Sequence, residues 1–156
     1  MAALYLLDTN ILIAALKGRA EVRERLKSLP LSAMRLSVVV LGELEFGAEK
    51  SAQGERNRLR LAALVTRLPL IGIDTETTRH YARLRALLER KGMTIGANDT
   101  WIAAQALTIH ATLVTDNERE FSRVPGLALE NWFAAARKIE CCWPASPDGA
   151  REDRDL

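Results

Sequence analysis

The sequence contains few of the residues on which several protein classes depend. Of its 156 residues only two are cysteine and two are histidine, and only 5% are aromatic. Cys141 and Cys142 are adjacent, a spacing that favours neither a relaxed mutual disulfide nor a zinc half-site of the C-x-x-C kind. The cysteine pair therefore indicates only that a reducing compartment is compatible with the sequence.

The chain also lacks a long hydrophobic run. The most apolar stretch near the N-terminus, residues 1–16, is interrupted by Asp8 and Asn10 and has no basic segment before it. It falls short of the roughly 20 uninterrupted apolar residues that a membrane span requires, and it shows no signal-peptide cleavage site. We interpret it as a buried strand followed by a helix, in a cytoplasmic protein that does not associate with a membrane.

The composition is that of a soluble globular domain, with 48% hydrophobic and 27% charged residues. A net charge of +2 is too small to indicate nucleic-acid binding, but the basic residues cluster in three segments, 17–27, 56–60 and 79–91. Two interpretations of these segments remain open. They are solvated helix faces, or they contact phosphates, in which case binding depends on salt.

Apolar periodicity predicts strands alternating with helices along most of the chain. The expected strands are residues 3–7, 35–39, 70–73 and 112–115. The expected helices are 10–16, 20–29, 40–50, 55–68, a long helix through Lys91 with Asp74 as its N-cap, and 99–109 with Asn98 as its N-cap. This alternation predicts an α/β fold with a mainly parallel sheet covered by helices on both faces.

We expect one domain over residues 1–137, since a chain of this length falls in the usual range of a single domain. Residues 138–156 contain the polar, proline-containing stretch from Pro144 onward, which shows no periodicity. This composition predicts a flexible C-terminal tail.

Four acidic residues stand close to the predicted carboxyl ends of strands or the starts of helices: Asp8, Glu43, Asp99 and Asp116. Any one of them alone is more simply explained as a helix cap or a helix-dipole partner. Ligands of open α/β sheets gather at the carboxyl edge, and four clustered carboxylates need a compensating cation. Together the four therefore predict a cation site at this edge.

Carboxylates are hard oxygen ligands, which favour Mg²⁺ or Mn²⁺ over Zn²⁺. Such an ion suits phosphodiester hydrolysis. The sequence lacks the motifs of other common active sites. It contains no GxxxxGK[ST] phosphate loop, no GxGxxG nucleotide-binding motif after a strand and no GxSxG nucleophile elbow. His80 and His110 form no HxxxH pair, and we interpret both as structural.

Four ordered stretches resemble the PIN-domain superfamily: Leu6 to Asn10, Gly42 to Gly47, Asn98 to Ala104 and Leu113 to Asn117. The stretch Glu118 to Leu127, followed by Asn131-Trp132, is similar to the VapC branch. The resemblance implies a three-layer sandwich and a Mg²⁺- or Mn²⁺-dependent endoribonuclease that cleaves structured RNA of the tRNA or rRNA class. It also implies a homodimer and an antitoxin partner, which we expect to lay an amphipathic segment into an apolar groove.

Carried over onto this sequence, the resemblance makes Asp8 and Asp99 the principal metal ligands, with Glu43 and Asp116 completing an acidic pocket. The family places its last acid variably, so Asn117 or Glu120 is an alternative to Asp116 or shares its task.

The neighbouring polar residues Thr9, Asn10 and Thr115 either hold the carboxylates or water in place or make only local turn hydrogen bonds. Trp101 lies either near the mouth of the pocket or in the core, and core packing is the favoured interpretation.

Two other functions share much of this pattern. One is a PIN nuclease that is not a toxin and processes RNA or acts on DNA. The other is a binding module for nucleic acid or protein that keeps the fold but cleaves nothing.

Overall fold

A five-stranded parallel sheet forms the centre of the computed structural model, which describes residues 2–133. The strands are β1 (Tyr5–Leu7), β2 (Met34–Ser37), β3 (Leu70–Ile71), β4 (Thr112–Val114) and β5 (Leu129–Glu130). They lie in the order β3-β2-β1-β4-β5, and every neighbouring pair is parallel. The expected α/β class is confirmed. The C-terminal boundary of the domain and the tail lie outside the described residues.

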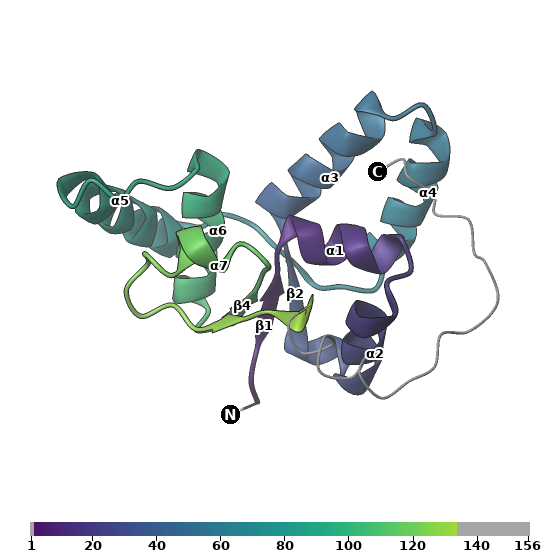
Figure 1. Cartoon of the computed structure of the whole chain (residues 1–156), viewed down its shortest axis with the longest axis horizontal. Helices are drawn as coiled ribbons and strands as arrows, with labels where there is room; N and C mark the ends of the chain where they lie inside the picture. Colours follow the sequence, from purple (N-terminus) through teal and green to yellow (C-terminus); the bar gives the residue numbers. More distant parts are fainter. Residues whose placement is uncertain (1, 134–156) are drawn as a thin grey trace.

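Helices connect the strands and cover the sheet. They are α1 (Thr9–Leu16), α2 (Ala20–Ser28), α3 (Val38–Lys50), α4 (Gly54–Val65), α5 (Thr75–Arg90), α6 (Ala97–Thr108) and α7 (Glu118–Phe121), with a 3₁₀ turn at Leu31–Ala33. In Figure 1, α1 to α4 gather on one side of the central strands and α5 to α7 on the other. This layering agrees with the expected sandwich. Among the described helices, none has the length and apolar character to cross a membrane.

The core lies where the central strands meet the helices. Leu6, Leu36, Leu113 and Val114 have no solvent exposure, as expected for strands covered on both faces. Near the C-terminal end of the described chain, Trp132 is also fully packed, with 1% exposure. The strands therefore hold the residues that follow them on a rigid frame.

Two of the expected boundaries that are wrong concern helix starts near the carboxyl edge. The predicted strand 35–39 ends at Ser37, because the Ser37 hydroxyl accepts the N–H of Val39 at 3.0 Å and starts α3. The hydrogen bond of this cap outweighs the β propensity of Val38 and Val39. Helix α6 begins at Ala97 after Gly96, so Asn98 lies inside its first turn and is not its N-cap.

Boundaries away from this edge show both agreement and error. Asp74 caps α5 as expected, accepting the Thr77 N–H at 2.8 Å. Helix α4 ends at Val65 instead of residue 68, and β3 ends at Ile71. Strand β5 and helix α7 were not predicted, because elements of two and four residues carry almost no periodic signal.

Candidate active site

The candidate site forms where β1 and β4 end side by side. These strands pair in parallel with Leu7 opposite Val114, so Asp8 and Thr115, the residues that follow, are brought together. The Asp8 N–H donates to the Val114 carbonyl at 2.9 Å. The pairing of two strands distant in sequence thus sets the base of the site.

Asp8 occupies this base and is almost completely buried, with 5% exposure. One carboxylate oxygen accepts the Thr9 N–H at 2.8 Å and caps α1, while the other accepts the Thr115 hydroxyl at 2.7 Å. Burial raises the pKa of Asp8, the two hydrogen bonds oppose this, and the negative charges of Glu43 and Asp116 raise the pKa further. The net effect is a raised pKa, to which burial contributes most and the two neighbouring carboxylates contribute less.

Glu43 approaches Asp8 from the second turn of α3. Its two carboxylate oxygens have separate donors: the Thr9 hydroxyl donates to Oε2, and Asn98 Nδ2 donates to Oε1 at 2.9 Å. The first donor belongs to α1 and the second to α6. Glu43 is therefore held between the two helices whose first residues border Asp8 and Asp99.

Asp99 completes the inner group from the first turn of α6 and is half-buried. Its pKa is raised to about 7, first by burial, then by the charge of Asp8, and further by a hydrogen bond and charge from Glu120 and by the charge of Glu43. Asn117 Nδ2 lies 3.5 Å from Asp99 Oδ2 and 3.4 Å from Glu120 Oε2, at the long end of hydrogen bonding. Asp99 and Glu120 thus form one face of the site.

Asp116 lies at the exposed rim, where its Oδ1 accepts Asn10 Nδ2 at 3.0 Å. Its charge acts on the pKa of Asp8, whereas Glu120 acts on Asp99. Asp116 and Glu120 therefore border the cluster from different sides, and the Asn117 side chain lies near Asp99 and Glu120. Which of the three serves as the fourth ligand stays a prediction.

The donor set fits a hard divalent cation. The charged side chains that act on Asp8 and Asp99 are all carboxylates, and their repulsion adds to the effect of burial in raising both pKa values, as expected for side chains that share a cation. Within residues 2–133, however, no three acidic, histidine or cysteine side chains are already arranged as a ready-made metal cluster. The chemistry of the site fits Mg²⁺ or Mn²⁺, and the side chains would have to close around the ion.

The two histidines and Trp101 take no part in this arrangement. His80 lies within α5, and His110 lies in the turn before β4, at the opposite edge of the sheet. Trp101 of α6 stacks on Tyr81 of α5, with ring centroids 3.7 Å apart. It is half-buried and packs α5 against α6, but it is not part of the hydrophobic core, so the core interpretation holds only for the helix–helix contact.

Sequence reasoning missed the role of Asn98, which it assigned to helix capping. Asn is a common N-cap, and its position just before Asp99 suited that reading. The adjacency to a predicted metal ligand was the signal that pointed to the site. Its side chain can reach Glu43 because Gly96, and not Asn98, is the N-cap of α6.

Comparison with known proteins shows to which family the chain belongs. The PIN domain family model matches residues 5–127. Over 133 residues, the chain is 41% identical to Ribonuclease VapC2 of Rickettsia felis, covering 83% of this chain and 98% of that protein. The chain belongs to the PIN domain family, in its VapC ribonuclease branch. This PIN domain is also 40% identical over 129 residues to the tRNA(fMet)-specific endonuclease VapC of Salmonella typhimurium, covering 82% and 97% of the two chains.

A solved relative of this PIN domain shows the same architecture. The crystal structure of VapBC2 from Rickettsia felis, bound to a DNA fragment from their promoter, superposes with a TM-score of 0.78 at 40% identity. The match covers 83% of this chain and 98% of that chain. The fold expected from the sequence resemblance is therefore confirmed by the structure of a close relative.

Proposed function

We propose that this PIN domain is a metal-dependent endoribonuclease that hydrolyses phosphodiester bonds in structured RNA, and that it is the toxin of a cytoplasmic toxin–antitoxin pair. The observation that carries the proposal is the meeting of Asp8, Glu43 and Asp99 at the carboxyl edge of the sheet, with raised pKa values for both aspartates. Membership of the VapC ribonucleases supplies the reaction class.

Asp8, Glu43 and Asp99 would hold Mg²⁺ or Mn²⁺, with Asp116 or Glu120 as the fourth acid. An ion held by these carboxylates would supply a water of lowered pKa and would shield the charge that develops on the phosphate. The Thr115 hydroxyl and the Thr9 N–H fix the orientation of the Asp8 carboxylate. With its pKa raised to about 7, the Asp99 carboxyl is only partly ionised near neutral pH and would have to lose its remaining proton to bind the ion.

The substrate class is proposed from the relatives. One relative at 40% identity bears the name tRNA(fMet)-specific endonuclease, which favours tRNA over rRNA for this chain. The basic segments 17–27, 56–60 and 79–91 offer phosphate contacts. Binding through such contacts should weaken as salt increases.

The decisive experiment incubates the purified protein, freed of any partner, with total RNA in Mn²⁺ or in EDTA. Discrete fragments are expected in Mn²⁺ only, and sequencing their ends identifies the substrate. Asp8→Asn and Asp99→Asn should abolish the fragments, whereas Glu45→Gln removes an exposed carboxylate outside the cluster and should not.

The same assay separates the alternatives. Cleavage of single-stranded or duplex DNA in preference to RNA would indicate a DNA-directed PIN nuclease. RNA binding without Mn²⁺-dependent cleavage would indicate a binding module. Persistent cleavage by both aspartate variants would refute the proposed site.

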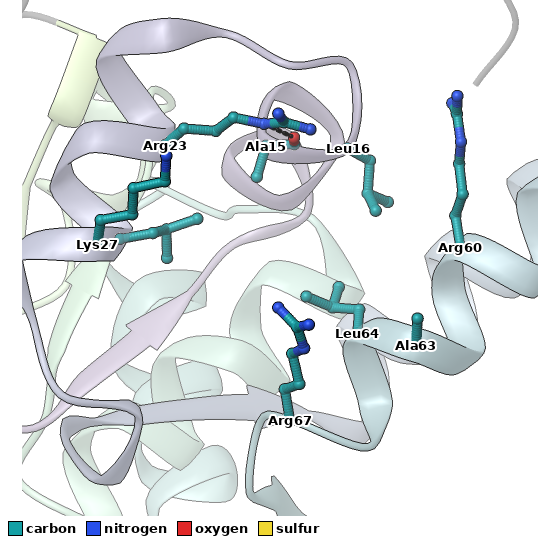
Figure 2. A pocket seen from close by; sticks show the side chains of 9 residues that line it. Ala15, Leu16, Arg23, Lys27, Arg60, Ala63, Leu64 and Arg67 are labelled. Atoms are coloured by element: carbon teal, nitrogen blue, oxygen red, sulfur yellow. Dashed lines mark hydrogen bonds between the residues drawn. The ribbon is translucent and has the colours of Figure 1, made fainter.

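The antitoxin has a candidate docking surface between α1, α2 and α4. A groove of about 530 Å³ is lined by apolar Ala15, Leu16, Leu26, Ala63 and Leu64 and by basic Arg23, Lys27, Arg60 and Arg67. Arg23 of α2 donates to the Ala15 carbonyl at 3.1 Å, and Figure 2 shows this contact together with Arg67, which follows the end of α4. With four cations and no acid among these lining residues, the groove fits an acidic amphipathic segment of the antitoxin.

Co-expression with the antitoxin from a neighbouring reading frame tests this surface. Reversing two groove charges, Lys27→Glu with Arg67→Glu, should weaken antitoxin binding about tenfold or more by like-charge repulsion. Arg83→Glu on the exposed surface of α5 is the matched control. Unchanged affinity of the groove variant, or binding by an antitoxin segment without acidic residues, would contradict the assignment.

The homodimer rests on the family resemblance alone. Light scattering coupled to gel filtration, with the protein free of antitoxin, measures its mass directly. A monomer at micromolar concentration would contradict this part of the proposal.

A further inference from the structure

The hydrogen bond between Asn98 and Glu43 joins two parts of the site that no strand pairing brings together. Glu43 lies on α3 and Asn98 on α6, separated by 55 positions in sequence. Asn98 Nδ2 donates to Oε1 of Glu43 at 2.9 Å, while the Thr9 hydroxyl donates to Oε2. Each carboxylate oxygen therefore has a donor of its own, and together the donors fix the rotation of the carboxylate plane.

Asn98 is available for this contact because α6 does not use it as a cap. The helix starts after Gly96, and the Thr100 N–H and hydroxyl both bond to the Gly96 carbonyl at 2.9 Å. Asn98 is exposed at the mouth of the site. An exposed amide loses side-chain conformational entropy when it is fixed by one hydrogen bond, and this loss offsets most of what the bond contributes. The contact with Glu43 therefore has a small effect on the free energy of unfolding.

We infer that Asn98 is a positioning residue, which aims the Glu43 carboxylate at the space between Asp8 and Asp99 where the ion would bind. The inference rests on the proposed function. An amide is suited to this task because it donates to a carboxylate without adding charge, so Glu43 keeps its full negative charge for the ion. A lysine or arginine at this position would orient Glu43 equally well but would neutralise it.

Loss of such an outer partner typically lowers metal affinity or activity 10- to 100-fold. Glu43 retains the Thr9 donor, so we expect the lower end, about tenfold, for Asn98→Ala. The effect should appear in kcat and in Mn²⁺ affinity, whereas KM for RNA should change less than about twofold, since the amide aims a metal ligand and not the RNA.

The test measures Mn²⁺ binding to the whole RNA-free protein by calorimetry, beside cleavage kinetics and thermal unfolding in EDTA. Asn98→Ala should bind Mn²⁺ about tenfold more weakly with an unchanged melting temperature. Asn98→Gln keeps an amide donor on an exposed side chain with room to adjust, and should restore part of the affinity. Gln53→Ala removes an exposed amide far from the site, where it accepts from Arg56, and is the matched control.

A double-mutant cycle with Glu43→Gln shows whether Asn98 acts through Glu43. In that background, Asn98→Ala should have almost no further effect on Mn²⁺ affinity. Additive losses would overturn the inference, as would wild-type affinity in Asn98→Ala. If the wild-type protein neither binds Mn²⁺ nor cleaves RNA, the proposed function falls and this inference with it. Wild-type activity with an unaffected Asn98→Ala variant refutes the inference alone.

Discussion

Replacing Asp99 by Asn should stabilise the metal-free protein while abolishing its activity. Asp99 is half-buried and faces the charges of Asp8, Glu120 and Glu43. Asn has nearly the same shape and carries no charge, so the substitution removes this repulsion without creating a cavity. The acidic site therefore lowers the free energy of unfolding of the metal-free protein, and Asp99→Asn should raise it.

The size of the gain follows from the pKa of Asp99. A rise from 3.8 to about 7 corresponds to roughly 4 kcal/mol at alkaline pH, if the full shift acts on the folded state. Because the carboxyl is only half-buried, solvent screening reduces this, and we expect about 1–2 kcal/mol. For a chain of this size, such a gain raises the melting temperature by roughly 2–8 °C.

The pH dependence identifies the cause. Between about pH 4 and 7 the folded protein binds more protons at Asp99 than the unfolded chain, so the wild-type free energy of unfolding falls as the pH rises. The advantage of Asp99→Asn should therefore be largest near pH 8 and decline toward pH 4. Urea unfolding in EDTA across this range measures it.

Asp74→Asn is the matched control with the opposite sign. Hydrogen bonds from the Thr77 N–H and hydroxyl lower the pKa of Asp74. The ionised carboxylate therefore stabilises the fold at every pH above the ordinary pKa of aspartate, and this stabilisation is lost only as the pH falls below that value. Asp74→Asn should be slightly destabilising, to the same extent at about pH 5 and pH 8. If Asp99→Asn behaves like Asp74→Asn, the crowding of negative charge around Asp99 is refuted.

Three further predictions concern binding and packing. Mn²⁺ affinity of the wild-type protein should weaken below about pH 7, because Asp99 must release its proton, and equal affinity by calorimetry at about pH 6 and pH 8 would argue against this role. Trp132→Ala should lower the free energy of unfolding by about 3–5 kcal/mol, because the indole ring is buried beside Tyr5. A loss below about 1 kcal/mol in urea denaturation would contradict that burial. Gln105→Leu removes the side-chain donor of two backbone carbonyls, those of Ile71 and Gly72, and should lower the free energy of unfolding by about 1–3 kcal/mol. Urea denaturation measures this loss, and an unchanged free energy of unfolding would contradict the prediction.

Local patterns made the central strands and Asp8 predictable. An apolar run of strand length followed by Asp is recognisable because burial on both faces requires continuous apolar residues and because Asp suits a helix start. The start of α3 was harder to place, since Val38 to Val40 look like strand until Ser37 is seen to cap them. Strand β5 contributes only two residues and depends wholly on pairing with β4.

The sequence by itself determined the α/β class, the parallel sheet and the acids at its carboxyl edge, because periodicity and helix-start preferences act over a few neighbouring residues. Only the tertiary structure decided that Asn98 faces Glu43, that Asp116 and Glu120 border different sides of the cluster, and that α1, α2 and α4 enclose a basic groove. These relations join side chains far apart in the chain. They depend on how whole helices pack against the sheet, and no local pattern encodes that packing.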